Sequence, residues 1–227
     1  MSTSTSGGVD RSHAPSIAPK LAFAALHAAI LMLCAYLAFG PFDWPDPTRA
    51  ALLFTAAALY FCRHMITLFI LLKRRVAYSE AIGLSAFMAL FESGFLLLGT
   101  GWLSGTATPL GPLDAFAVAL ILTGSYLNSG SELQRHIWKR DPAHKGKCYT
   151  GGLFAYSMHI NYFGDTVLFT GWALLSASWL AAPIPVFITA SFIVFHIPAL
   201  DAYLADRYGE AFKSYAARTA KFVPYLY

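Results

Sequence analysis

Residues 21–40 read LAFAALHAAILMLCAYLAFG, an apolar run as long as the about 20 residues that a helix needs to cross a bilayer. Five more apolar runs follow, at residues 50–72, 81–104, 112–128, 165–182 and 183–200. The composition agrees, since 57% of the residues are hydrophobic and 12% are charged, whereas soluble domains carry about a quarter charged residues. We therefore predict an all-α, polytopic transmembrane bundle of about six helices.

The chain is expected to have three parts. Residues 1–20 are rich in Ser, Thr and Gly and have no apolar period, which predicts a disordered cytosolic tail and not a cleaved signal peptide. Residues 21–127 would form transmembrane helices around a substrate cavity. Residues 128–227 hold most of the polar motifs and form a C-terminal part, which the resemblance given below implies is the cofactor-binding region.

Lys and Arg predict the sidedness of the bundle. They fill one loop at residues 73–75, a second at residues 135–147 and the C-terminal tail, all on one side if the N-terminus is cytoplasmic. The opposite loops contain Asp43 and Asp46, with Arg49 as their only cation. Because Lys and Arg favour cytoplasmic loops, both termini are predicted to be cytoplasmic. Topology thus accounts for the net charge of +4 without a nucleic acid, and membrane lipids are the expected surroundings.

The cysteines and histidines predict no metal centre. Cys34, Cys62 and Cys148 are widely spaced, and the seven histidines contain no close ligand pair. Structural thiols are the simplest interpretation.

Ionisable residues inside the apolar runs indicate function more strongly, because a charge at mid-bilayer costs about 2.5–3.5 kcal/mol on insertion scales. At about 1.5 Å per residue, Tyr60 and Glu92 lie at similar depths on adjacent antiparallel helices. A polar stripe with three- and four-residue spacing runs along the second helix; its members are Tyr60, Arg63, His64 and Thr67. Two interpretations remain open: a hydrogen-bonded clamp between helices, or a substrate cavity in which Tyr60 donates a proton and Glu92 supports it.

A second polar face begins where the fourth apolar run ends. Its residues recur at three- and four-residue steps, which places them on one side of a helix: Asn128, Glu132, Arg135, His136 and Lys139. Asn128 and Glu132 lie at the membrane interface, where polar groups without partners are costly. We expect these two side chains to have a ligand or a protein partner.

The C-terminal half resembles the steroid 5-alpha-reductase family and its bacterial membrane relatives. Four elements occur in the family's order: an N-x-x-S-[DE] element at residues 128–132, GGLF-x-Y at residues 151–156, N-Y-F-G-[ED] at residues 161–165, and a tail with Tyr203, Tyr215 and Phe222-Val223-Pro224. Isoprenylcysteine carboxyl methyltransferases have a related membrane core. The resemblance rests on the four elements together and not on any one of them.

The resemblance implies a multi-pass membrane protein that holds NADPH at the cytoplasmic end of the bundle. Cations there would bind the cofactor phosphates, and Asn and carboxylate groups would bind its ribose and amide; glycines at residues 151 and 152 would allow close backbone approach. The implied cofactor-binding residues are Asn128, Glu132, Arg135, Lys139, Gly152, Tyr156, Asn161, Tyr162, Asp165 and Tyr203.

The N-terminal half is similar to the family at Leu59-Tyr60-Phe61-x-Arg63, the element that contributes the catalytic Tyr. The family's reductases pair this Tyr with a Glu from a more N-terminal helix, but residues 21–40 contain no carboxylate. Glu92 is the candidate replacement, so Tyr60 and Glu92 are the predicted catalytic residues. A second departure is Ser157-Met158-His159-Ile160, where bacterial relatives carry Arg-His-Pro.

The expected reaction is NADPH-dependent reduction of a C=C bond conjugated to a carbonyl, in a lipophilic substrate such as a steroid or an isoprenoid. Tyr60 would polarise the carbonyl oxygen. Two alternatives remain: an S-adenosylmethionine-dependent methyltransferase of the isoprenylcysteine type, and a non-catalytic lipid-binding protein. A cytoplasmic-facing site is compatible with a bacterial inner membrane or an endoplasmic reticulum.

Overall fold

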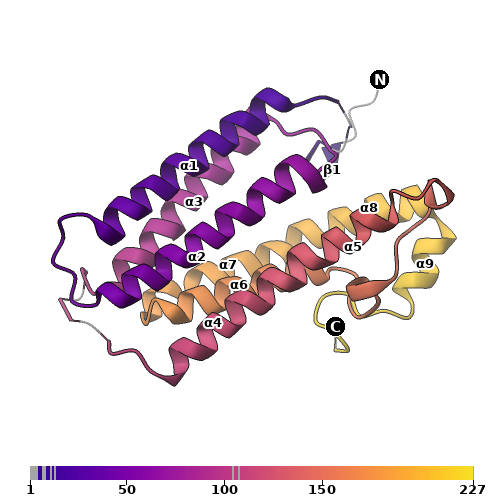
Figure 1. The fold of residues 1–227 in the computed structure, drawn as a ribbon. Coiled ribbons are helices and arrows are strands. Elements are labelled where there is room, and N and C mark those ends of the chain that lie inside the picture. The colour runs from indigo at the N-terminus through magenta and orange to yellow at the C-terminus, as the bar shows by residue number, and fades with distance from the viewer. Residues whose placement is uncertain are drawn as a thin grey trace.

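A computed structural model describes residues 5–6, 9–10, 12, 14–103, 105–106 and 108–226 of the chain. The described part is almost entirely helical (Figure 1), apart from the two-residue strands β1 (Thr5–Ser6) and β2 (Val9–Asp10). Helix α1 (Ile17–Phe39) begins inside the predicted tail, so the expected boundary at residue 20 was four residues too late. Half of the remaining tail, residues 1–4, 7, 8, 11 and 13, lies outside the described residues.

The first group of helices contains α1, α2 (Pro47–Ile66) and α3 (Tyr78–Gly99), which pack against one another. Helix α2 begins at Pro47 because Asp46 caps it, its side chain accepting a hydrogen bond from the Arg49 backbone N–H at 2.9 Å. A π-helical turn, Thr67–Leu71, extends α2 toward the loop that leads to α3.

The second group contains two long helical rods on either side of α6 (Ile160–Leu175). One rod is α4 (Pro112–Ser125), the π turn Tyr126–Gly130 and α5 (Ser131–Trp138). The other is α7 (Pro183–Ser191), the π turn Phe192–His196 and α8 (Ile197–Tyr208), followed by α9 (Glu210–Ala216). Short 3-10 turns lie at Pro142–His144, Gly152–Ala155 and Trp179–Ala181.

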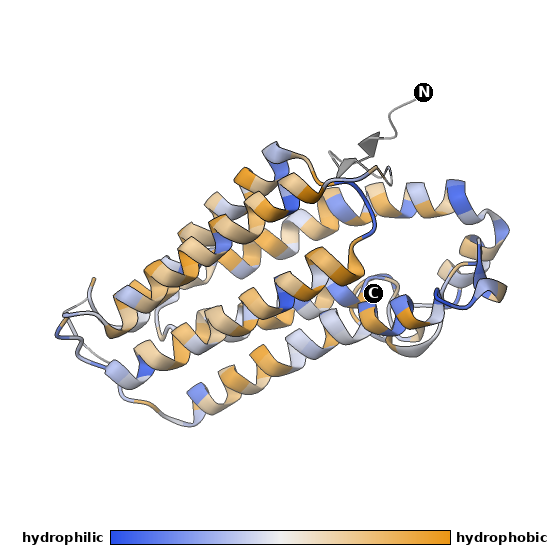
Figure 2. Ribbon diagram, turned by 45° about the horizontal axis from the view of Figure 1, so that its top comes forward, coloured by the Kyte–Doolittle hydropathy of each residue, from blue (hydrophilic) through white to orange (hydrophobic). Residues whose placement is uncertain are grey.

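Four of the described helices are long and apolar enough to span a membrane: Ile17–Phe39, Pro47–Leu71, Tyr78–Gly99 and Trp179–Tyr208. The span expected at residues 165–182 was misplaced, because α6 begins at Ile160 and ends at Leu175. The chain turns at Ala177, which has a positive φ of 51°, and the apolar residues from Trp179 onward belong to the last span. Figure 2 shows that apolar residues dominate the helices and that polar residues gather in the end loops.

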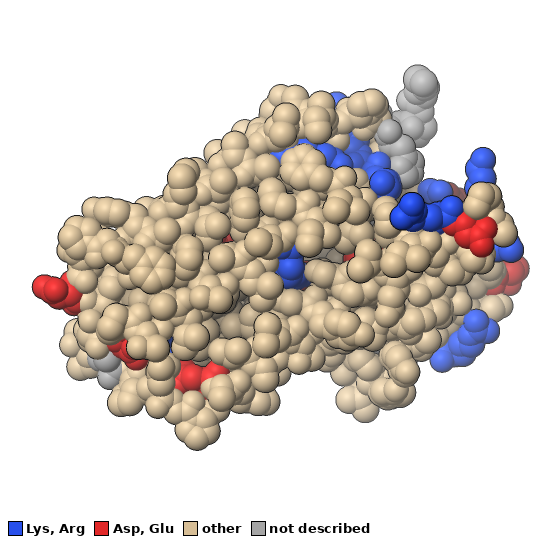
Figure 3. Space-filling view, viewed as in Figure 1, with Lys and Arg blue, Asp and Glu red and all other residues tan. Residues whose placement is uncertain are grey.

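The two ends of the bundle differ in charge. Figure 3 shows Lys and Arg gathered at the end that contains α9 and the α2–α3 loop, which we call the basic end. Asp and Glu dominate the opposite end in this view. The distribution is the one that predicts a cytoplasmic basic end, and the sidedness stays a prediction.

Arg49 ties the opposite end together. Its side chain is fully buried and pairs with Asp114 at the start of α4. It also donates to the Leu175 carbonyl at 2.7 Å and to the Thr108 carbonyl at 2.9 Å. One cation therefore connects the starts of α2 and α4, the end of α6 and the α3–α4 loop, which offsets the cost of burying it.

Candidate functional site

Glycines bring α4 and α6 into close contact and thereby position the candidate site. A Cβ atom at Gly124 would collide with the α6 backbone at Gly164 and Leu168, and one at Gly164 would collide with the backbone at Asn128. Small residues allow transmembrane helices to approach this closely. The approach places the π turn Tyr126–Gly130 directly beside the first turns of α6.

The residues brought together form a continuous hydrogen-bond network. Asn128 Nδ2 donates to the Asn161 carbonyl at 3.0 Å and to Asp165 Oδ2 at 2.9 Å. Asn161 Nδ2 donates to Glu132 Oε1 at 3.0 Å, and Glu132 pairs with Arg135. Five predicted cofactor residues, three within residues 128–135 and two within residues 161–165, therefore share one site. We call these residues and Arg63 the polar network: Arg63, Asn128, Glu132, Arg135, Asn161 and Asp165.

Arg63 joins this network from the other group of helices. It donates from Nε to Ser129 Oγ at 3.0 Å and from Nη2 to Asp165 Oδ1 at 2.9 Å. Its Nη1 is buried and has no hydrogen-bond partner among the described residues. Arg63 was expected in the polar stripe on the second helix and in the element that contains Tyr60, but not as a cofactor-binding residue, because the sequence does not show that its partner lies on α6.

Other cations surround the network at the basic end. Lys139 Nζ donates to the Tyr208 hydroxyl at 2.9 Å, and Arg207 donates to the Tyr203 hydroxyl at 2.5 Å. The predicted residue Lys139 thus directly follows α5 and contacts a tyrosine, and Tyr203 lies on α8 and contacts an arginine. Tyr162 has a different environment, since its ring stacks on His159 and on Phe192.

Gly152 and Tyr156 lie apart from the polar network. Gly152 has a φ of +55°, and the space beside its Cα is filled by Gln134 and the Tyr149 hydroxyl. Gln134 Oε1 accepts a hydrogen bond from the Leu153 backbone N–H at 2.9 Å. Glycine is therefore required here by packing, and a role of this residue toward a cofactor stays a prediction.

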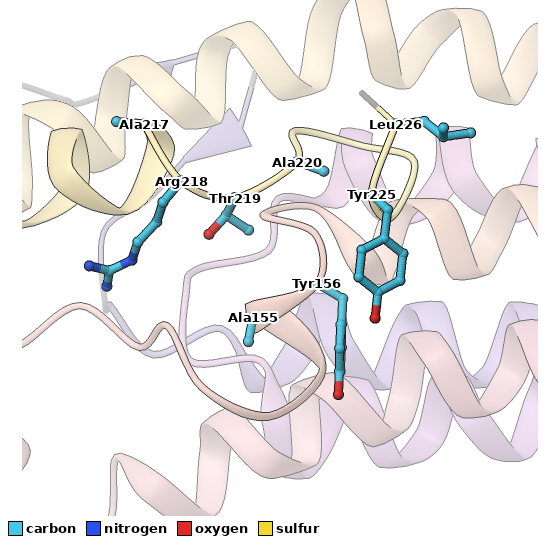
Figure 4. A pocket seen from close by; sticks show the side chains of 8 residues that line it. All are labelled: Ala155, Tyr156, Ala217, Arg218, Thr219, Ala220, Tyr225 and Leu226. Carbon is cyan, nitrogen blue, oxygen red and sulfur yellow. The ribbon is translucent and has the colours of Figure 1, made fainter.

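Tyr156 lies on the rim of a cavity of about 450 Å³ next to the C-terminal tail (Figure 4). Tyr225, Arg218 and Thr219 line the same cavity. A second cavity of about 270 Å³ lies at the opposite end of the bundle, beside Ser176 and Trp179. Neither of these two cavities is lined by the polar network.

The segment that departs from the expected Arg-His-Pro motif holds the C-terminal tail. Ser157 Oγ donates to the Phe222 carbonyl at 2.8 Å, and the Met158 backbone N–H donates to the Ala220 carbonyl at 2.8 Å. The Tyr215 hydroxyl donates to the Phe154 carbonyl at 2.5 Å. Burial raises the pKa of this hydroxyl, so it stays a neutral donor. The segment therefore fixes the tail against the start of α6.

His159 is a buried residue that the sequence analysis did not select. Its Nε2 lies 2.8 Å from Asp201 Oδ1 on α8, and Lys221 Nζ lies 3.5 Å from Asp201 Oδ2. The available signal was its position two residues before the Asn161-Tyr162 element. This contact joins α6, α8 and the tail beside Tyr162.

The second candidate region is a packed cluster of buried aromatic rings around Tyr60, which we call the aromatic chamber. The Tyr60 ring lies 5.5–5.6 Å from the rings of Phe91, Phe169 and Trp172 and 4.3 Å from the His64 ring. Tyr60 is 8% exposed. The chamber excludes water from the phenol, which strengthens any electrostatic interaction made there.

Glu92 faces the same chamber but bonds to a residue that was not predicted. Its Oε1 lies 2.8 Å from His27 Nε2 on α1, and both side chains are fully buried. The His27 ring lies 6.0 Å from the Tyr60 ring. His27 was the only ionisable residue in the apolar run at residues 21–40 besides Cys34 and Tyr36, which was the signal for it.

The sequence model of one family, described as a protein of unknown function (DUF1295), matches residues 93–219. The chain belongs to this family. The matched region contains five members of the polar network but not Arg63, and it excludes His27, Tyr60 and Glu92.

Two curated relatives are similar to parts of the chain. A probable O-methyltransferase, ustE, from Ustilaginoidea virens is 33% identical over 105 residues, which is 46% of this chain and 37% of the relative. A Delta(14)-sterol reductase from Methylotuvimicrobium alcaliphilum is 29% identical over 128 residues, which is 48% of this chain and 30% of the relative. The aligned segments thus span about a third of the length of each relative.

Proposed function

We propose that this protein is a membrane-embedded, NADPH-dependent reductase of a C=C bond conjugated to a carbonyl in a lipophilic substrate, steroid- or isoprenoid-like in shape. One observation carries the proposal. Arg63 contacts both candidate regions, since it bonds to Asp165 at 2.9 Å and its guanidinium carbon lies 5.5 Å from the centre of the Tyr60 ring. A cofactor bound at the polar network would therefore be adjacent to the phenol.

The residues of the polar network fit a dinucleotide phosphate. Arg135 supplies a cation, and its side chain is 42% exposed and accessible to phosphate oxygens. Lys139 and Arg207, outside the network, are further cations at the basic end. Asn161, Asp165 and Glu132 offer the donors and acceptors that ribose hydroxyls and an amide require. The unpartnered Nη1 of Arg63 is a further donor directed into the protein. When bound, NADPH would supply a hydride, and the protein would orient it and exclude water.

Tyr60 would polarise the carbonyl oxygen of the substrate and give it a proton. A phenol in a dry site is a suitable hydrogen-bond donor to an oxygen on which negative charge develops. The surrounding rings of Phe91, Phe169 and Trp172 offer apolar contacts to a flat, greasy substrate. The similarity to a sterol reductase supports the same reaction class.

A methyltransferase is the second candidate, because the similarity to a probable O-methyltransferase favours it. The carboxylates and aromatic rings at the basic end could also hold the sulfonium cation of S-adenosylmethionine. Methyl transfer, however, gives no role to a phenol next to a buried histidine and carboxyl. The chamber therefore favours the reductase.

Purified protein in detergent or nanodiscs tests the two candidates directly. We expect NADPH fluorescence to change on binding and NADPH to be consumed with a lipophilic enone, with a product two hydrogens heavier by mass spectrometry. Asp43→Asn, at the opposite end of the bundle, is a matched charge control that should bind NADPH like the unmodified protein. Binding of S-adenosylmethionine without binding of NADPH would replace the reductase with the methyltransferase.

A further inference from the structure

The His27–Glu92 contact lies deep among the first three helices. The two side chains are 0% exposed, and the 2.8 Å contact joins α1 to α3. An ionisable pair inside a membrane bundle is costly, and a pair of well-packed apolar residues would commonly be as stable or more stable. The helices do not need this pair for packing, so the presence of a buried histidine and carboxyl requires another explanation.

Each member of the pair also has a free polar atom. His27 Nδ1 and Glu92 Oε2 are buried and have no hydrogen-bond partner among the described residues. A buried polar atom without a partner costs about 1–3 kcal/mol. A helix clamp gains nothing from such atoms, whereas a group that binds and releases a proton must have an open position.

The groups around the pair connect it to Tyr60. The His64 ring lies 5.3 Å from the His27 ring and 4.3 Å from the Tyr60 ring. His64 Nδ1 lies 3.0 Å from the Tyr60 carbonyl oxygen, and since that oxygen can only accept, Nδ1 carries the hydrogen. The Nε2 atom of a neutral His64 is then a proton acceptor.

Few other titratable groups face the pair. Among the described residues, Cys34 on α1 and Tyr60 on α2 interact electrostatically with Glu92. Arg63 on α2 and Asp165 on α6 interact with Tyr60 and bond to each other. Tyr60 and its two histidine neighbours are therefore the groups through which a proton would move.

We propose that the His27–Glu92 pair holds the proton that returns to Tyr60 in each turnover, with His27 as a positioning residue and His64 between the pair and the phenol. This inference rests on the proposed reductase function and names the residues that supply its proton. It also explains why the first helix has no carboxylate: His27 on that helix holds the carboxyl of Glu92 on α3.

The proton balance is simple. Reduction of the conjugated C=C bond needs one hydride and one proton, and the hydride comes from the bound nicotinamide. Tyr60 Oη gives its proton to the substrate oxygen, and the enol so formed becomes the saturated ketone. The His27–Glu92 pair then gives a proton to the Tyr60 oxygen by way of His64 Nε2, and water at the basic end refills the pair.

Infrared spectroscopy tests the proton store without cofactor or substrate. We expect a pH titration of the purified protein to show a carboxyl band that disappears at high pH and that is absent from Glu92→Gln. His27→Gln should keep a hydrogen bond to Glu92 but shift the pH at which this band disappears. The titration runs from about pH 5 to about pH 10, a range that includes the ordinary pKa values of His and Tyr. A Glu92 band that stays unchanged over this range would overturn the inference.

Kinetics then test the role in turnover. We expect His27→Gln to lower kcat by about a hundredfold, because Tyr60 is no longer efficiently reprotonated and its general acid catalysis is lost. The dissociation constant of NADPH should stay within about twofold. The kcat of the unmodified protein should fall as the pH rises and the pair loses its proton. This falling limb of the pH–kcat profile should be absent from His27→Gln. The matched control is His159→Gln, which removes the other 2.8 Å histidine–carboxylate contact and should retain the limb.

A double variant covers the case in which single variants do not fold. His27→Leu with Glu92→Leu replaces the pair with apolar side chains, so we expect it to fold and bind NADPH but to lose turnover. Full turnover in this variant would overturn the proton store while the reductase function stands. If the unmodified protein neither binds nor consumes NADPH, the reductase function fails first and the inference fails with it.

Discussion

The polar network and the aromatic chamber differ in how they are built. The network joins α5 and α6 at the basic end, is partly open to solvent and consists of side chains that bond to one another. The chamber lies among α1, α2, α3 and α6, is dry, and contains atoms that have no partner. Of the network's buried side-chain atoms in the described residues, Arg63 Nη1 alone has no partner, and this atom is open to a ligand. The chamber's unsatisfied His27 and Glu92 atoms are suited to reaction, and the largely satisfied network is suited to binding.

The largest loss of activity should follow a substitution in the aromatic chamber. We expect Tyr60→Phe to lower kcat by about a thousandfold, since it removes the acid that gives a proton to the substrate. The dissociation constant of NADPH should stay within about twofold because the phenol does not bond to the network. Tyr36→Phe, on an exposed face of α1, is the control, and unchanged turnover in Tyr60→Phe would remove the distinction between the two regions.

The contact between the regions should dominate stability. We expect Arg63→Met to lower the free energy of unfolding by about 3 kcal/mol, because Asp165 loses the cation that compensates its burial. Thermal unfolding in detergent measures this. Arg74→Met removes a more exposed ion pair with Glu80 and should cost less than about 1 kcal/mol; equal losses in the two variants would mean that Arg63 does not join the regions.

The close contact of α4 with α6 should be sensitive to one methyl group. We expect Gly164→Ala to cost about 2 kcal/mol in thermal unfolding, because the added Cβ collides with the α4 backbone. Gly94→Ala is the matched control, since its Cβ would meet nothing within 4 Å and should stabilise α3 slightly. If both variants unfold alike, the glycines do not set the distance between the two helices.

The smallest effect should follow the substitution of a single side chain in the polar network, and it should appear in NADPH binding. We expect Asn161→Ala to weaken NADPH binding about tenfold, because Glu132 loses a donor and the ligand loses a polar partner. Turnover at saturating NADPH should change little, in contrast to Tyr60→Phe. Fluorescence titration and steady-state kinetics measure the two quantities separately, and a loss of kcat without a loss of binding would contradict the division of roles.

The helical class and four of the six expected membrane spans were predictable because apolar runs of this length have few alternatives. The runs at residues 112–128 and 165–182 do not match a candidate span among the described residues. The five members of the network on α4–α6 were also predictable, since Asn128 and Asn161 stand in recognisable motifs. The Arg63–Asp165 and His27–Glu92 pairs were not, because each joins residues far apart in the chain and depends on how the helices pack. The boundaries of α6 were missed because hydropathy continues through the turn at Ala177.

The buried Arg49 at the acidic end has a mechanical consequence. Through its hydrogen bonds and ion pair, it holds α2, α4, α6 and a connecting loop together at one point. Parting the helices there would strand a cation in hydrocarbon, so we expect that end to stay shut. A lipophilic molecule that enters sideways from the bilayer would then pass between the helices nearer the basic end, where they can separate.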